Sequence, residues 1–519
     1  KNPKHVASAV VGEYGQFWFR PKELVNGFRM QTNTKITFDN LHMYTVPYQA
    51  IFSNDSEYFQ IINSSVEPAP GTKERFSSYG GVEVHSVDGY FRMENCHLEG
   101  INDDNLHLSN HFFGGGVSGN PKIDNYTVAL DHLTHWMHYN EVYEGATFGM
   151  RDANFKDLGW TSKVVSYAWE NYFTDDGNAP WRCTVTFADP LPSNYKDTNQ
   201  FWNMDKNTGN YIVRNNTFEG GLAHAMYLGL ANGTVENNRV ENFAYPGLIL
   251  NCLIRWDRWA IGTPINNKAL RDPAAMFVGG GIDEQPSDYN PVSGRIVSNV
   301  LVENNVVEST PWAAFGTFSS KNIVIRNNSF INASTTAKKS GKPGGNVFIT
   351  NADNVVCTGN TVYHGAVSYE TGINVDSATT TSVYSQSNHI QKYVKNNGLY
   401  GDIIVDTNTY GFEKVAGSWS NSSYAGYSAT VIGSSSTGAQ VRWRPLLRRG
   451  HYEVFIYKMV VGASEAADEA TQIQVKHKNG TYSTTMNCHS GTKGFVSLGT
   501  FEFEEGNVGY VQATRSSSS

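Results

Sequence analysis

A short phrase of alternating hydrophobic and polar residues, centred on two asparagines, recurs along the chain. It first reads Ile212-Val-Arg-Asn-Asn-Thr-Phe218. Close copies lie at 234–240, 301–307 and 323–330, a weaker copy lies at 355–362, and related phrases lie at 36–41 and 60–65. The central residues Asn216 and Asn238 are 22 positions apart. A nearly constant period of this length, with short strands on both sides of a polar turn, predicts a solenoid.

The paired asparagines indicate how each coil turns. Asparagine tolerates left-handed backbone angles and bonds its own chain, so it suits a tight turn. Stacked at one position in coil after coil, its amides can also form hydrogen-bonded ladders. We therefore expect an all-β chain whose main part is a right-handed parallel β-helix, a scaffold whose long flat faces suit an extended polymer.

The period is lost in two places and ends before the C-terminus. Residues 111–205 are strand-like but not periodic. This predicts a small β subdomain inserted into a parallel β-helix domain that covers residues 1–407. A second break lies at about 253–293, and long loops on a solenoid often form its binding face. Residues 408–519 have Ser-rich turns between strictly alternating strands, which predicts an antiparallel β-sandwich.

Composition and charge narrow the choice of partners. The 519 residues include 40 basic and 48 acidic side chains, a formal net charge of −8, without a basic stripe. Nucleic acids and anionic membranes are therefore poor candidates, and no apolar run has the length of a membrane span. The sequence begins at Lys1 rather than Met, and we expect a secreted, periplasmic or cell-surface protein whose export signal lies outside this sequence.

The five cysteines have no metal-type spacing. We expect buried free thiols, and neither a metal nor another cofactor. No feature of the sequence indicates an oligomeric state.

Candidate chemistry comes from carboxylates that a solenoid would stack. Glycoside hydrolysis usually needs one protonated and one ionised carboxyl group. Coils lie about 4.8 Å apart, so acids from successive coils can meet, and their repulsion raises one pKa. Asp103 and Asp104 are the best candidates, because Gly100 and Asn102 predict a bend that lets both face one site. Glu83 lies roughly one coil earlier. The alternative is an ordinary solvated turn.

Several motifs in this region resemble one known family. They are Val66-Glu-Pro-Ala-Pro-Gly-Thr72, Ser77-Ser-Tyr-Gly-Gly-Val82, Met93-Glu-Asn-Cys-His-Leu-Glu-Gly100 and Asp103-Asp-Asn-Leu-His107. Together they are similar to glycoside hydrolase family 110. The resemblance implies an inverting, exo-acting α-1,3-galactosidase on a β-helix with an inserted β-barrel, and it assigns catalytic roles to Asp103 and Asp104.

The chain departs from that family at one important position. The family has an aspartate where this chain has Gly80, in Tyr79-Gly-Gly-Val-Glu83, one coil before the acidic pair. Glu83 stands at the family's histidine position, and we consider it as a substitute acid. The family also uses an acid downstream of its pair, for which Glu141 and Glu144 are the candidates here.

The C-terminal region resembles a second known module. Its phrases are Trp443-Arg-Pro, Gly450-His-Tyr-Glu-Val, Leu498-Gly-Thr-Phe-Glu-Phe503 and Gly509-Tyr-Val511. They resemble the golvesin-like or xanthan-lyase-type C-terminal sandwich. Such modules accompany secreted bacterial polysaccharide enzymes, so an accessory or carbohydrate-binding-like role is the expectation.

Aromatic and polar side chains could form the surface that holds a sugar, because aromatic faces pack on the C–H faces of pyranose rings while polar groups bond hydroxyls. The candidates for substrate binding are His85, His107, Trp136, His138, Glu144, Arg255, Trp256 and Trp259. The histidines at every third position between Asp131 and Glu141 would line up as metal ligands only on a helix. A strand, which we expect here, disperses them.

Three functions remain open. The first is an inverting exo-glycosidase acting on terminal α-galactosides of an oligo- or polysaccharide, with Asp103 or Asp104 as general base and its partner or Glu83 as acid. The second is a polysaccharide lyase, which needs Ca²⁺ or Arg to neutralise a uronate and a basic residue such as Arg92, Arg151 or His85. The third is a non-catalytic glycan binder, which the glycine at position 80 keeps open.

Overall fold

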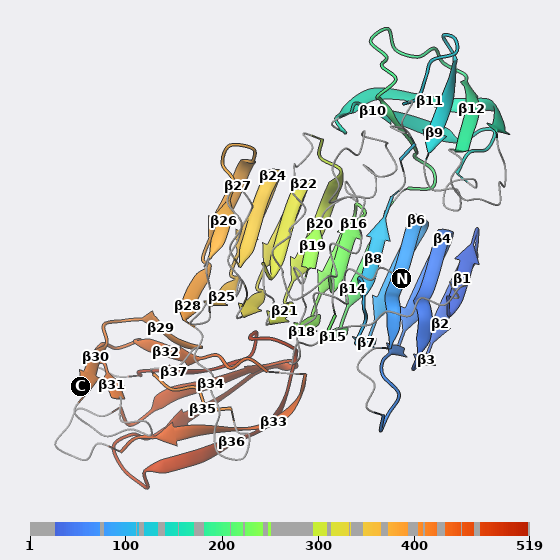
Figure 1. Cartoon of the computed structure of the whole chain (residues 1–519). Coiled ribbons are helices and arrows are strands. Elements are labelled where there is room, and N and C mark those ends of the chain that lie inside the picture. The colour runs from blue at the N-terminus through green and yellow to red at the C-terminus, as the bar shows by residue number, and fades with distance from the viewer. Residues whose placement is uncertain are drawn as a thin grey trace, which may run out of the picture.

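The computed structural model describes most of the chain. The described residues are 26–72, 77–110, 112–113, 119–132, 141–153, 155–170, 181–207, 209–221, 224–241, 248–250, 294–308, 313–331, 333, 346–364, 372–392, 403–407, 411–422, 431–447, 449–460 and 468–516. They form an all-β protein with a long parallel part, an antiparallel insertion and an antiparallel C-terminal part (Figure 1).

The parallel part is a β-helix with three faces. Four long strands of its 14-stranded sheet bend and so belong to two faces: β4 (Val46–Ile62), β6 (Ser78–Glu94), β22 (Phe315–Arg326) and β24 (Val347–Thr358). The bends fall at residues with left-handed backbone angles, such as Asp55 (φ 57°), Ser86 (φ 54°) and Asn351 (φ 48°). The part before the bend belongs to face 1 and the part after it to face 2.

The other strands stack on these two faces or build the third. Face 1 also contains β1 (Phe28–Gln31), β8 (Leu106–Ser109), β16 (Met226–Gly229), β19 (Leu248–Leu250) and β26 (Ile373–Val375). Face 2 adds β2 (Thr34–Asp39), β14 (Tyr211–Arg214), β17 (Gly233–Glu236), β20 (Val297–Glu303) and β27 (Thr381–Gln386). Face 3 is a nine-stranded sheet of β3 (His42–Met43), β5 (Ser65–Val66), β7 (His97–Glu99), β15 (Thr217–Glu219), β18 (Arg239–Glu241), β21 (Val306–Glu308), β23 (Ser329–Ile331), β25 (Thr361–His364) and β28 (His389–Lys392).

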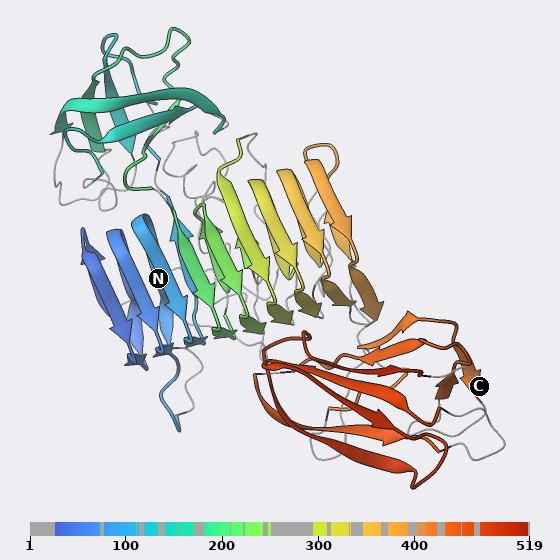
Figure 2. The ribbon, with the colours of Figure 1, turned by 180° about the vertical axis from the view of Figure 1, so that it is seen from behind.

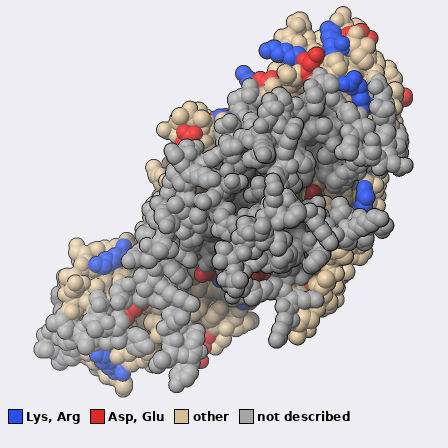
Figure 3. All heavy atoms as spheres, in the orientation of Figure 1, with Lys and Arg blue, Asp and Glu red and all other residues tan. Residues whose placement is uncertain are grey.

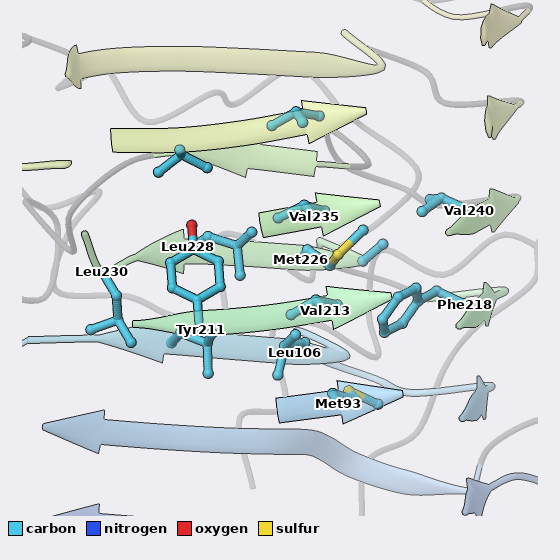
Figure 4. Close-up of a cluster of buried hydrophobic side chains, with 14 of the residues drawn as sticks. Met93, Leu106, Tyr211, Val213, Phe218, Met226, Leu228, Leu230, Val235 and Val240 are labelled. Atoms are coloured by element: carbon cyan, nitrogen blue, oxygen red, sulfur yellow. The ribbon is translucent and has the colours of Figure 1, made fainter. Parts of the chain in front are cut away.

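Alternation along each short strand decides which side chains enter the helix. Val213 and Tyr211 of β14 point inward and are buried, whereas Ile212 between them is 36% exposed. Inward residues of the three faces meet in one continuous core, where Met226 lies near Val213 and Phe218 (Figure 4). The burial of these apolar side chains is the main favourable contribution to the stability of the coils.

The predicted asparagine ladder is present between faces 2 and 3. Six asparagines are joined in sequence, each Nδ2 donating to the Oδ1 of the next at 2.9–3.0 Å. The five at 216, 238, 305, 328 and 360 are buried, and the last, Asn388, is half-buried. The preceding residue adopts a left-handed conformation, as at Asn215 (φ 59°) and Asn237 (φ 56°). The first asparagine of each pair therefore makes the turn, and the second satisfies buried backbone groups.

The inserted subdomain leaves the helix after β8 and returns before β14, close to the predicted limits. It consists of β9 (Thr127–His132), β10 (Thr147–Arg151), β11 (Asp157–Glu170), β12 (Trp181–Phe187) and β13 (Gln200–Asn203), all antiparallel. It has its own core around Phe148, Phe187 and Phe201. Because β8 pairs with both β6 and β16, the coils continue past the insertion without a gap.

The C-terminal part is the expected antiparallel sandwich. One sheet contains β29 (Phe412–Ala416), β32 (Gln440–Trp443), β37 (Tyr510–Thr514), β34 (Thr471–His477) and β35 (Gly480–Met486). Two strand pairs accompany it, β33 (Gly450–Lys458) with β36 (Gly494–Phe503) and β30 (Ser420–Ser422) with β31 (Val431–Gly433). The sandwich lies beside one end of the helix (Figure 2), where Arg239 of face 3 donates from Nη1 to Oε1 of Glu505 at 3.0 Å.

Of the five cysteines, four belong to the described residues and are free thiols. Cys96, Cys183 and Cys357 are buried as expected, and Cys488 is half-buried.

The ladder predicts a stability difference between two asparagines. Asn238→Ala removes the buried Oδ1 that accepts hydrogen bonds from the backbone N–H and from the side-chain Nδ2 of Asn216. It also removes the Nδ2 that donates to the backbone oxygen of Val213. Each buried group left without a partner costs about 1–3 kcal/mol, so we expect the free energy of unfolding to fall by roughly 2–5 kcal/mol. Urea denaturation measures it.

Asn299 provides the matched control, because it belongs to an exposed ladder, with its Nδ2 donating to Asn232 at 2.9 Å. Asn299→Gly preserves the left-handed turn and should cost less than about 1 kcal/mol. Equal losses in the two variants would contradict a special role for the buried ladder.

Candidate acid–base site on face 1

Outward-facing side chains of face 1 form a row of acids and histidines. In β6, Val82 and Val84 point into the core, so Glu83 and His85 point outward. The register pairs Glu83 with His107 of β8, and His107 with Tyr227 of β16. Parallel pairing thus stacks residues from three coils, and we call Glu83, His85, Asp104, His107, His224 and Tyr227 the acid–base row.

Glu83 and His85 form a hydrogen-bonded pair on one strand. His85 Nε2 donates to Oε1 of Glu83 at 2.8 Å, and His85 Nδ1 lies 2.6 Å from the hydroxyl of Ser109. Burial alone would raise the pKa of Glu83, but the bond from His85, its charge and that of His107, and a bond from Gln49 together lower it. Burial lowers the pKa of His85 despite the neighbouring carboxylate. These surroundings therefore favour the ionised form of Glu83 and disfavour the protonated form of His85.

Asp104 holds two histidines from different coils. Its Oδ1 accepts hydrogen bonds from the backbone N–H of His224 at 3.0 Å and from His224 Nδ1 at 2.8 Å, and its Oδ2 lies 3.3 Å from His107 Nδ1. Burial opposes its ionisation, but the two imidazoles lower the pKa of Asp104 well below its ordinary range. In return, although burial alone would lower it, the hydrogen bond and the charge of Asp104 raise the pKa of His107.

His107 is held at one ring nitrogen, and its other ring nitrogen is buried. Its side chain is 8% exposed, its Nδ1 points to Asp104, and its buried Nε2 has no hydrogen-bond partner within the described part of the chain. The ring lies between those of His85 and Tyr227, with centroid distances of 5.4 Å and 5.1 Å. A histidine oriented through Nδ1 by a carboxylate, with Nε2 unpartnered, has the arrangement of a general acid or base.

The acidic pair lies on a bend, as the sequence indicates. Gly100 has φ 67°, and the turn that follows places Asp104 toward face 1. Asp103 Oδ1 accepts the backbone N–H of Asp104 at 3.1 Å, and its charge contributes to the raised pKa of His107. The pair is therefore divided between an aspartate that bonds histidines and one that stabilises the turn.

Gly80 has a definite structural role beside this row. A Cβ added at Gly80 would lie 3.1 Å from Cγ of Gln49 on the paired strand. The absence of that atom gives Gln49 room to donate from Nε2 to Oε2 of Glu83 at 2.9 Å. The position where the similar family has an aspartate thus accommodates a glutamine that bonds Glu83.

The remaining predicted site residues lie elsewhere. Glu141 is fully buried at the junction of the inserted subdomain and the helix, and burial raises its pKa to about 7. Glu144 is exposed in the turn before β10. The proposed sugar-binding residues Trp136, His138, Arg255, Trp256 and Trp259 lie outside the described residues.

One group with potential metal ligands occurs within the described residues. Ligand atoms of Glu67, His97 and Glu99 on face 3 lie within 4.8 Å of one another. They also bond each other, with His97 Nδ1 at 3.3 Å from Glu67. Because face 3 is a different sheet from face 1, this group takes no part in the acid–base row.

Sequence reasoning missed His224 and Tyr227. The insertion separates His224 from Asp104 by 120 positions, so no regular period connects them. Matching Leu106-His-Leu with Met226-Tyr-Leu across the insertion is the signal that could have found them, because these triplets occupy the same register on successive coils.

The fold and this row define an all-β protein that joins a parallel β-helix, with a row of acids and histidines on one face, to a C-terminal β-sandwich. Residues 403–519 match the family model of the golvesin C-terminal domain. No curated protein matches the chain.

Three solved structures with some likeness to the chain are a xanthan lyase, an alginate epimerase and a phage tailspike. A xanthan lyase of Paenibacillus is 22% identical over 22% of this chain and 11% of its own, with a TM-score of 0.20. A double mutant of the periplasmic alginate epimerase AlgG is 8% identical over 70% of this chain and 79% of its own, with a TM-score of 0.23. The tailspike gp61 of Pseudomonas phage phi297 is 8% identical over 88% and 90%, with a TM-score of 0.18. Similarities of this size identify no activity.

Among the residues that the structure describes, no helix is long and apolar enough to cross a membrane.

The coupling of Asp104 to His107 is testable without an assay. In Asp104→Asn the carboxylate charge that favours the imidazolium is lost, and burial then dominates. We expect the pKa of His107 to fall below its ordinary value, as measured by NMR titration of the histidine side chains. Asp157→Asn, at an exposed position of the inserted subdomain, is the control, and an unchanged His107 titration in Asp104→Asn would contradict the pairing.

Proposed function

We propose that the protein is an exported glycoside hydrolase that cleaves a glycosidic bond of an oligo- or polysaccharide at face 1. The observation that carries this proposal is His107, held at Nδ1 by Asp104 and unpartnered at Nε2, directly beside the ionised Glu83. An acid and a base on neighbouring rungs of one sheet provide the two proton transfers that hydrolysis requires.

Each residue of the row then has a role. The imidazolium of His107 donates its Nε2 proton to the departing glycosidic oxygen as the bond to the anomeric carbon breaks. Glu83 accepts a proton from the water whose oxygen forms the new bond to that carbon, with Asp103 as the alternative base. Asp104 orients His107 and keeps it protonated. Since Asp104 has this role toward His107, the role of base is assigned to Glu83 rather than to Asp104.

The charges near the row favour a neutral sugar. Glu83, Asp103 and Asp104 all contribute negative charge, which repels a uronate carboxylate. Lys206, from the segment that returns from the insertion, is already paired with Asp55 at 3.1 Å and with Asp88 at 3.7 Å. The described surface in Figure 3 has basic and acidic side chains interspersed at both ends, without a field of one sign. A neutral glycan is the partner that these charges suit best.

The finer assignment follows from the family resemblance. Terminal α-galactosides are the proposed substrates, with inversion at the anomeric carbon. The golvesin-type domain, at residues 403–519, is proposed as an accessory module of an enzyme that works outside the cytoplasm. A histidine replaces the usual protonated carboxyl group. The acid limb of the pH–rate profile is therefore set by a carboxyl group, Glu83, and the alkaline limb by an imidazole, His107.

A lyase is the second candidate, and one observation favours it. The Nε2 of His107 lies in a site that also contains the Tyr227 ring, and a neutral histidine with a tyrosine could abstract and return protons in a β-elimination. Such a reaction needs the uronate to be neutralised, which the negative row opposes. A non-catalytic glycan binder would show binding without turnover.

Substitution at the two proposed catalytic residues tests the proposal. Glu83→Gln and His107→Gln should each reduce turnover of terminal α-galactosides by about 10²–10⁴-fold, with the fold retained by circular dichroism. NMR of the first-formed product anomer reports inversion. Asp157→Asn is the control for an exposed carboxylate, and near-normal turnover in both site variants would refute the assignment.

The products distinguish the alternatives. A new reducing end without an unsaturated sugar supports hydrolysis, whereas an ultraviolet-absorbing unsaturated product would establish the lyase. Binding that is unaffected by either substitution, without any product, would establish the glycan binder.

The pH profile follows from the two pKa shifts. The lowered pKa of Glu83 keeps the base ionised into the acidic range, and the raised pKa of His107 keeps the acid protonated above its ordinary value of 6.5. The rate should therefore be maximal between the two and should fall as pH rises through the pKa of His107. Asp104→Asn should move that alkaline limb to lower pH, and an unmoved limb would mean that His107 is not the acid.

A further inference from the structure

The inserted subdomain contacts the helix next to the acid–base row through one buried acid. Glu141, which lies between β9 and β10, is 0% exposed. Its Oε1 accepts from the hydroxyl of Ser86 at 2.7 Å, and its Oε2 accepts from Nδ2 of Asn207 at 3.2 Å. Asn203 also donates from Nδ2 to the backbone oxygen of Glu141 at 2.6 Å. This carboxyl group therefore ties the insertion to the β6 strand.

Ser86 is a sensitive point of that strand. It follows His85 directly, and its φ of 54° is uncommon for serine and must be maintained by its surroundings. His85 in turn donates to Glu83 at 2.8 Å. A short chain of bonded groups therefore leads from Glu141 of the insertion, through Ser86, to the proposed catalytic carboxylate.

The junction is crowded with charges. Lys206 pairs with Asp55 and Asp88, and Asp55 occupies the left-handed bend of β4 on the coil next to Ser86. Against the effect of burial, the charges of His85 and Lys206 lower the pKa of Glu141. Burial raises the pKa of Glu141 to about 7 and that of Asp55 to about 6, so near neutral pH both are poised between their neutral and charged forms.

We propose that Glu141 is a positioning residue, which holds the Glu83–His85 pair through Ser86 and makes the inserted subdomain a working part of the glycan site. Its effect on turnover rests on the hydrolase function proposed above, but its effect on His85 does not. The protonated carboxyl group maintains the junction best, because ionisation adds a buried charge that Asp55 repels.

Two variants of the full chain separate positioning from simple loss of packing. Glu141→Gln keeps an oxygen for Ser86 without the charge, whereas Glu141→Ala removes the acceptor. We expect Glu141→Ala to reduce kcat by about 10–100-fold, as for other residues that orient a catalytic group, with a smaller change in KM, and Glu141→Gln to retain most of the turnover. Asp157→Asn should resemble the wild type.

NMR titration of His85 provides a readout that needs no substrate. We expect Glu141→Ala to shift the titration of His85, because the Ser86 turn no longer holds the bond to Glu83, and Glu141→Gln to change it less. If the proposed hydrolase function is wrong, no variant turns over a glycan substrate, but the shift in the His85 titration is still observed. If turnover is present and neither kcat nor the His85 titration responds to Glu141→Ala, the positioning role is overturned.

The melting temperature checks the protonation dependence. A carboxyl group whose pKa rises on folding from 4.5 to about 7 favours the folded state fully below the lower value, and that contribution is lost as pH rises to the higher one. The wild type should therefore lose melting temperature relative to Glu141→Gln between about pH 4.5 and 7. Parallel curves for the two proteins would contradict a buried, protonated Glu141, and Glu141→Ala failing to fold would leave this comparison intact.

Discussion

The structure depends on one constraint, which is that every coil must repeat the backbone hydrogen-bond register of the coil before it. The asparagine turns enforce this constraint. One residue of each pair takes a left-handed conformation, as at Asn237, and the buried amide of the next, Asn238, bonds both the neighbouring asparagine and the Val213 carbonyl. A shift of one residue would place polar side chains in the core and break the ladder, so register and burial support each other.

The acid–base row is a consequence of that register. Because residues in the same place on successive coils are stacked at the inter-strand spacing, Glu83, His107 and Tyr227 meet although they are distant in sequence. The pKa values of two buried acids in this region diverge for a physical reason. Burial opposes the ionisation of both, but two imidazole partners lower the pKa of Asp104, whereas Glu141 is bonded to neutral groups and burial raises its pKa. The same scaffold thus lowers the pKa of Glu83 and raises the pKa values of His107 and Glu141 within one region.

The insertion shows how a solenoid acquires a complex site without losing its continuity. It interrupts a coil between two strands, where added chain is tolerated, and β8 before the insertion still pairs with β16 after it. Gly80 contributes to the same site, because the lack of a side chain at this position leaves the space through which Gln49 reaches Glu83. Within the row, His224 and Tyr227 are the two residues that neither spacing nor the family-like motifs connect to the others.

Much of the architecture was determined by local pattern alone. Period, alternation and paired asparagines predicted the β-helix, the insertion and the sandwich, because each coil makes mainly contacts with its neighbours and so repeats its own rule. The bend at Gly100 and the outward placement of Glu83 and His85 were predictable for the same reason. The tertiary structure alone decided that His224 and Tyr227 join them, that Asp104 bonds histidines, and that Glu141 is buried beside Ser86. These outcomes depend on contacts across a long insertion and on burial from all sides, and neither is encoded in the spacing of residues along the chain.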